Sequence, residues 1–150
     1  MQRVVIGSAA SQWAPVTSRV TLGSLLGPSL FTVFINDLPE ETVDAVMVAL
    51  YADDTKVYRS TNEWADALYT LQTTLTNLDE WSQRNNIRFN ASKCKALTVT
   101  RKKNPLTYHL NQVQLERVTN EKDVGVTVTR TLSWDQHVHT VFSKADSLGF

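Results

Sequence analysis

The chain has 150 residues, of which 42% are hydrophobic and 20% are charged, the composition of an ordinary globular protein. Its 15 basic residues balance its 15 acidic ones, and this zero net charge argues mildly against autonomous nucleic-acid binding, which depends on a basic surface. A single cysteine excludes an internal disulfide framework and no apolar stretch could span a bilayer, so we expect one soluble, intracellular domain of the nucleus or the cytoplasm.

The start of the chain predicts a strand pair, a loop that contains glycine, and a helix. Residues 4–6 and 16–20 are rich in valine and could pair as strands. After the loop, the apolar residues of 29–38 fall on one face of a helix. Pro28 suits the first turn of this helix, and we expect Pro39 to end it.

Two adjacent carboxylates, Asp53 and Asp54, follow a long apolar run, and residues 55–58 after them again favour a strand. This pattern predicts a β-hairpin with the acids at its tip. Like charges held side by side repel, and a divalent cation is the usual compensation. Magnesium suits such a site because it takes a few carboxylate oxygens and shares the rest with water and phosphate. An Asp pair is also a good turn former, so the residues alone leave both interpretations open.

A long amphipathic helix follows the hairpin. Apolar residues recur at alternating steps of four and three from Trp64 to Leu78, and the helix should end near Asn85. Ser60 and Glu63 have the spacing of a capping box at its start. The pattern is too short for a coiled coil, so we expect the helix to lie across a sheet.

The last third of the chain predicts short strands and a final helix. We expect a strand over residues 96–100, a small hairpin over 107–115, a strand over 123–128 and a helix capped by Ser133. The basic run 101–103 could touch a nucleic-acid backbone or form a solvated turn.

The histidines and the cysteine do not form a zinc site in this pattern. His137 and His139 are two residues apart, whereas His109 and Cys94 are remote from them. We expect surface histidines on the final helix.

The order of these elements resembles the palm of a reverse transcriptase, most closely that of the non-LTR, jockey-like RNA-directed DNA polymerases of retrotransposons. Residues 18–28 parallel the family's S-G-V-P-Q-G-S-x-L-G-P, residues 30–39 its L-F-x-x-F-I-N-D-L-P, and residues 51–56 its Y-A-D-D-T-K. Residues 89–95 and 121–126 are similar to its F-N-x-x-K-C-K and E-K-x-L-G-V. One of these motifs alone would be weak evidence, but their shared order is specific and favours a functional role for the Asp pair.

The resemblance implies an α+β fold with a palm-like antiparallel sheet and helices on one face. Residues 1–100 would form the palm, with the glycine loop and the hairpin, and residues 101–150 the end of the palm and the start of the thumb. Both ends look cut, because the chain begins in a predicted strand and stops in a predicted helix.

The resemblance also implies an activity and roles for particular residues. The activity would be RNA-directed DNA synthesis with an RNA template, a DNA primer, deoxynucleotides and Mg²⁺ or Mn²⁺. Asp53 and Asp54 match the metal-holding pair, and Tyr51 would stand next to the primer end. Gly23 maps to the loop under the template and the incoming base, where glycine allows close backbone approach. Lys93 falls where the family often has a lysine near the pyrophosphate, although a solvated surface lysine is the alternative.

The chain departs from the family's pattern in its first 23 residues. None of them is acidic, whereas the family has a third metal-binding aspartate before the glycine loop. Arg19, Thr21 and Leu22 replace the family's Gly, Pro and Gln, and Leu22 cannot form the hydrogen bond expected near the template. We therefore expect this chain alone to lack polymerase activity. A non-catalytic interaction or scaffold module, and a non-functional relic of a mobile element, are the alternatives.

Overall fold

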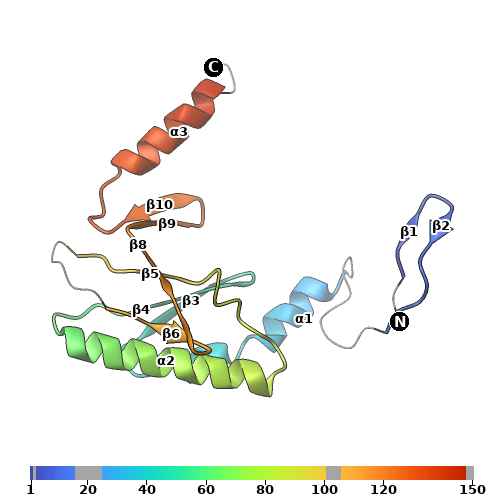
Figure 1. Ribbon diagram of the computed structural model, residues 1–150, viewed down its shortest axis with the longest axis horizontal. Coiled ribbons are helices and arrows are strands. Elements are labelled where there is room, and N and C mark those ends of the chain that lie inside the picture. Colours follow the sequence, from blue (N-terminus) through green and yellow to red (C-terminus); the bar gives the residue numbers. More distant parts are fainter. Residues whose placement is uncertain (2, 16–24, 101–105, 148–150) are drawn as a thin grey trace.

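The computed structural model describes residues 1, 3–15, 25–100 and 106–147, and Figure 1 shows the arrangement of its elements. Helix α2 runs along one side of the central strands, whereas the β1–β2 hairpin and α3 lie at the outer ends of the molecule. In chain order the elements are β1 (Val5–Ile6), β2 (Ala9–Ala10), α1 (Gly27–Phe34), the 3-10 helix η1 (Leu38–Glu41), β3 (Met47–Tyr51), β4 (Asp54–Tyr58), α2 (Trp64–Arg84), β5 (Lys95–Leu97), β6 (His109–Leu110), β7 (Val113–Gln114), β8 (Glu116–Val118), β9 (Asn120–Asp123), β10 (Val126–Thr129) and α3 (Asp135–Ser147).

The hydrophobic core lies along α2, which contributes to two clusters. One cluster joins α2 to the segment around β6 and β7 (Ala67, Leu75, Leu106, Tyr108, Leu110 and Leu115). The other, which we call the Trp81 cluster, consists of Leu38 of η1 with Leu78 and Trp81 of α2. Trp81 and Leu38 are only 1% and 2% exposed. Val57 of β4 packs against both clusters, so the core supports the β3–β4 hairpin directly.

Helix α2 confirms the prediction made from its apolar spacing, but its start differs from the one expected. Glu63 is the N-cap residue, and its side chain forms no capping hydrogen bond. A capping box would require Ser60 to be the N-cap and Glu63 to lie one turn inside the helix. Instead, the hydroxyl of Thr61 accepts a hydrogen bond from the backbone N–H of Glu63 at 3.0 Å and forms the turn before the helix.

The helix predicted over residues 29–38 consists of two pieces. Helix α1 has Pro28 in its first turn, as expected, but it ends at Phe34, ahead of Pro39. Pro39 lies in the first turn of η1, where its missing N–H costs no hydrogen bond. The break between α1 and η1 places Leu38 against α2 in the Trp81 cluster, whereas α1 has no buried residue.

The described strands pair two by two, and the single palm-like antiparallel sheet that was expected is not formed among them. Four pairs are antiparallel (β1–β2, β3–β4, β6–β7 and β9–β10), and β5 pairs with β8 in parallel. The described residues therefore form a small mixed α and β structure.

Three strand predictions need correction. The strand predicted over 123–128 is a hairpin, because Val124 and Gly125 have φ values of 46° and 88° and turn the chain between β9 and β10. The strand predicted over 96–100 is β5, which begins one residue earlier and ends at Leu97. The partner of β1 is β2, and the partner predicted at 16–20 lies outside the described residues.

The end of the chain follows the prediction more closely. The small hairpin is present as β6–β7. The Ser133 hydroxyl accepts a hydrogen bond from the backbone N–H of Asp135, the first residue of α3, at 3.3 Å. His137 is half-buried rather than fully on the surface, because its Nδ1 accepts a hydrogen bond from the Thr127 N–H at 3.2 Å and joins α3 to β10. Within the described ranges, no helix is long and apolar enough to cross a membrane.

Candidate functional site

The Asp pair lies at the tip of an antiparallel hairpin, as the sequence predicts. Strands β3 and β4 pair up to Tyr51 and Asp54, which leaves Ala52 and Asp53 as a two-residue loop. Ala52 has a φ of 52°, a left-handed conformation that glycine adopts readily and alanine adopts at a cost. This short loop places two acidic residues in adjacent positions at the end of the hairpin.

The hairpin has a buried face and an exposed face, because side chains alternate along each strand. Val48, Leu50 and Val57 are half-buried and pack against the Trp81 cluster. The residues between them are exposed and form the outer face (Met47, Ala49, Tyr51, Asp54, Lys56 and Tyr58). Asp54 therefore projects from the outer face of a hairpin whose inner face is anchored to the core.

The carboxylates of Asp53 and Asp54 are available to a ligand. Both residues are exposed, and neither carboxylate has a hydrogen bond or an ion pair with another described residue. Tyr51, 64% exposed, pairs directly with Asp54. Magnesium is usually held by one or two carboxylates, with the remaining positions filled by water and phosphate. The donor set at the tip therefore fits a divalent cation.

Among the residues that the structure describes, the tip has two acidic residues and no third ligand. Among the described residues, no group of three or more His, Cys, Asp or Glu residues could hold a metal ion. The 18 residues outside the described ranges contain none of these four residue types. Of the residues that the structure describes, Asp53 and Asp54 are therefore the two carboxylates at the tip.

Of the other predicted site residues, Tyr51 lies beside Asp54, whereas no described contact brings Lys93 to the tip. Gly23 and the basic run 101–103 lie outside the described residues. Lys93 is exposed in the turn before β5, where its backbone N–H donates to the carbonyl of Asn90 at 2.9 Å. Within the described part of the chain, no hydrogen bond or ion pair joins its side chain to the Asp pair. The role of Lys93 stays a prediction.

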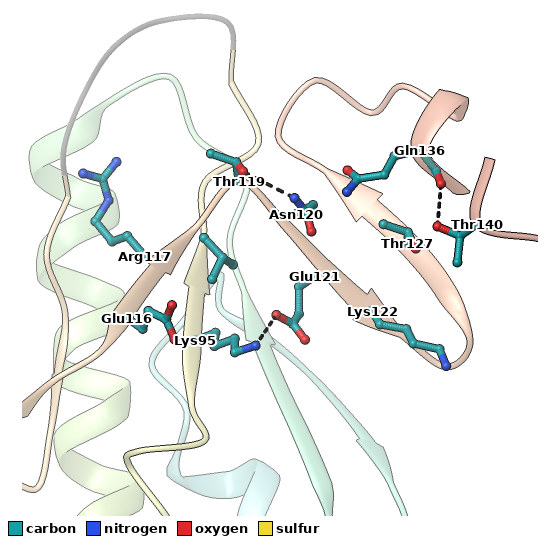
Figure 2. A pocket seen from close by; sticks show the side chains of 11 residues that line it. Lys95, Glu116, Arg117, Thr119, Asn120, Glu121, Lys122, Thr127, Gln136 and Thr140 are labelled. Carbon is teal, nitrogen blue, oxygen red and sulfur yellow. Dashed lines mark hydrogen bonds and ion pairs between the residues drawn. The ribbon is translucent and has the colours of Figure 1, made fainter. Parts of the chain in front are cut away.

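A polar groove of about 610 Å³ lies elsewhere, lined by residues of β5, β8, β9, β10 and α3 (Figure 2). Its charged residues are of both signs (Lys95, Glu116, Arg117, Glu121 and Lys122). Figure 2 shows Lys95 pointing toward Glu121, and the Nζ and Oε2 atoms are 3.1 Å apart. The sequence did not reveal this groove, because its walls come from segments that are brought together only by the fold.

Two ion pairs join β9 to neighbouring strands, and neither was predicted from the sequence. Asp123 at the end of β9 pairs with Lys56 of β4, and Glu121 pairs with Lys95 of β5. Lys56 and Asp123 are 67 residues apart, so no local pattern links them. The only available signal was opposite charge, and of these four residues only Lys56 and Asp123 lie in predicted strands.

Two titratable groups outside the hairpin are affected by burial. Burial raises the pKa of the Cys94 thiol and that of the Tyr108 hydroxyl, because it disfavours their charged forms. The Cys94 thiol donates a hydrogen bond to the carbonyl of Asn90 with a sulfur-to-oxygen distance of 3.3 Å. Because the raised pKa keeps this half-buried thiol neutral, we expect it to react slowly and to have a structural rather than a catalytic role.

Several known polymerases of mobile elements are similar to the chain over most of its length. It is 31% identical over 145 residues to the "RNA-directed DNA polymerase from mobile element jockey" of Drosophila melanogaster, a match that covers 92% of this chain and 16% of that protein. It is 33% identical over 136 residues to the "Probable RNA-directed DNA polymerase from transposon X-element" of the same species, covering 87% and 15%. The jockey polymerase of Drosophila funebris is 29% identical over 130 residues, covering 82% and 14%.

The chain thus spans only about one sixth of the length of these relatives. No solved structure matches it significantly. The family model described as "Reverse transcriptase (RNA-dependent DNA polymerase)" matches residues 3–141, which is nearly the whole chain and includes the hairpin. The chain therefore belongs to the reverse transcriptase family.

Proposed function

We propose that the chain is part of the catalytic core of a retrotransposon RNA-directed DNA polymerase, with Asp53 and Asp54 as its metal-holding residues. The observation that carries this proposal is the pair of exposed carboxylates, which have no partner among the described residues. Turn formation does not account for Asp54, because the two loop residues are Ala52 and Asp53 and Asp54 follows them as the first residue of β4. Asp54 is a strand residue, and aspartate is otherwise depleted in strands.

The proposed reaction joins the 3′-hydroxyl of a DNA primer to the α-phosphate of a deoxynucleotide, under the direction of an RNA template. Bound Mg²⁺ or Mn²⁺ supplies activation of the attacking oxygen and charge stabilisation for the pyrophosphate that leaves. Asp53 and Asp54 would hold the cations, and Tyr51, beside Asp54 on the outer face, would contact the primer end. Gly23 would lie under the template and the incoming base, and Lys93 near the pyrophosphate.

We also propose that the isolated chain does not extend a primer. The tip provides two acidic residues, whereas the family uses a third aspartate, and no described residue brings a third carboxylate to the tip. A primer-extension assay on an RNA template with Mg²⁺ or Mn²⁺ tests this proposal. DNA synthesis that depends on Asp53 would contradict it.

Metal binding tests the site itself, independently of polymerisation. We expect the chain to bind Mn²⁺ weakly, as measured by the electron paramagnetic resonance signal of the free ion. Asp53→Asn and Asp54→Asn should each lower the affinity on the order of tenfold, because each removes one of few ligands. Asp44→Asn is the matched control, since Asp44 is an exposed aspartate in the turn before β3.

Equal Mn²⁺ affinity in the hairpin variants and the wild type would contradict the proposed site. Together with unchanged stability of the two variants, that result would favour the interaction or scaffold module instead.

A further inference from the structure

The ion pair between Lys56 and Asp123 bears directly on the metal site of the proposed function, on which the inference rests. Lys56 lies on the outer face of β4, two residues from Asp54. Residues i and i+2 of a strand share a face, with Cα atoms about 7 Å apart. A lysine side chain can reach across such a spacing. Among the described residues, Lys56 is therefore a cation well placed to compete with a metal ion for the carboxylate of Asp54.

The structure shows the ammonium group of Lys56 engaged elsewhere. It forms an ion pair with the carboxylate of Asp123. It also lies over the ring of Tyr58, with the Nζ atom 5.7 Å from the ring centroid. Tyr58 is two residues beyond Lys56 on the same face, in the direction away from the tip. Both contacts draw the positive charge away from Asp54.

The position of β9 is also maintained by a second, independent ion pair. Glu121 and Asp123 are two residues apart on β9 and both half-buried, whereas Lys122 between them is exposed. The inward face of β9 thus presents two carboxylates, of which Glu121 pairs with Lys95 of β5. Of these two pairs, only that of Asp123 involves the hairpin that carries the proposed site.

We infer that Asp123 is a positioning residue: it holds the ammonium group of Lys56 away from Asp54 and so leaves the Asp54 carboxylate free for a divalent cation. The role is electrostatic and acts through Lys56, because Asp123 itself is not at the tip. It also gives the β9–β10 hairpin a function in the proposed site, although that hairpin supplies no ligand.

A double-mutant cycle on the complete 150-residue chain tests this inference, with the dissociation constant for Mn²⁺ as its readout. Asp123→Asn should weaken Mn²⁺ binding about threefold at roughly 0.1 M salt, the effect of a unit charge some 7 Å from a divalent ion. In a Lys56→Met background, the same Asp123→Asn change should have no effect, since the competing charge is gone. Asp123→Glu keeps the ion pair and should keep the wild-type affinity.

Glu121→Gln is the matched control, because it removes an equal charge from the same face of β9 but leaves Lys56 paired. We expect it to leave the Mn²⁺ affinity unchanged. Three results would overturn the inference: no weakening by Asp123→Asn, equal weakening with and without Lys56, or equal weakening by Glu121→Gln. Wild-type Mn²⁺ binding that does not depend on Asp54 would instead contradict the proposed function, and the inference with it.

Discussion

Replacing Trp81 by alanine tests whether the Trp81 cluster is the support of the hairpin. Trp81 is 1% exposed, and its ring centroid lies 6.0 Å from that of Phe34 and 6.5 Å from that of Phe89. Its indole N–H donates to Oδ1 of Asp37 at 3.2 Å. Truncation of a buried tryptophan costs about 3–5 kcal/mol. The aromatic contacts add to the burial, so we expect a loss of about 4 kcal/mol in the free energy of unfolding.

This loss is a large part of the roughly 5–15 kcal/mol by which a domain is stable. In a urea titration followed by far-UV circular dichroism, an m-value of about 2 kcal/mol/M converts it to a shift of about 2 M in the midpoint. Trp81→Phe keeps an aromatic ring and loses the hydrogen bond to Asp37, so it should cost only about 1–2 kcal/mol.

Trp134→Ala is the matched control, because Trp134 is 64% exposed. This substitution should cost less than about 1 kcal/mol. If Trp81→Ala shifts the midpoint no more than Trp134→Ala does, Trp81 is not a core residue and the proposed support of the hairpin is wrong.

Three further predictions concern turns and titration. Val124 has a φ of 46°, which a β-branched residue adopts at a cost, so Val124→Asn should raise the free energy of unfolding by about 1 kcal/mol; a lower urea midpoint would contradict this. Ala52→Gly should raise the free energy of unfolding by about 0.5 kcal/mol, because glycine accepts the φ of 52° at this position more readily than alanine does. An unchanged or lower thermal midpoint would argue against backbone strain at Ala52. Burial raises the pKa of Cys94, so the folded chain should react with iodoacetamide more slowly than the urea-unfolded chain at pH 8, and equal rates would contradict this. Because the folded state holds the thiol proton more tightly, this contribution to stability is fully present below the unfolded pKa and is lost as the pH rises through the folded pKa.

The β3–β4 hairpin and α2 could be predicted because the information for each is local. Strand-forming residues on both sides of an Asp pair predict the hairpin, and its register needs no distant contact. The spacing of apolar residues from Trp64 onward likewise predicts the inward face of α2. The sequence therefore placed the Asp pair correctly at the tip of a hairpin, although the metal ion that it would bind is still a proposal.

The features that were missed depend on contacts between distant segments, or on nearby residues that favour a different local structure. Nothing near Lys95 indicates the parallel pairing of β5 with β8, and nothing near Lys56 indicates Asp123. At 123–128 the alternating valines resemble a strand, but Gly125 allows a turn that the valine pattern conceals. Before α2, the nearer hydroxyl of Thr61 replaced the expected capping box. The missed features thus concern how the elements pair and where they begin, break or end, rather than whether a segment is helix or strand.

The most direct measurement of the proposed site is paramagnetic broadening of the backbone amide signals by substoichiometric Mn²⁺, in two-dimensional NMR spectra of the ¹⁵N-labelled chain. We predict that the signals of Ala52, Asp53 and Asp54 broaden first, and that Asp54→Asn reduces this effect. Earlier broadening around the groove acids Glu116 and Glu121, with the signals of the hairpin tip unaffected, would contradict the assignment of the metal site to Asp53 and Asp54.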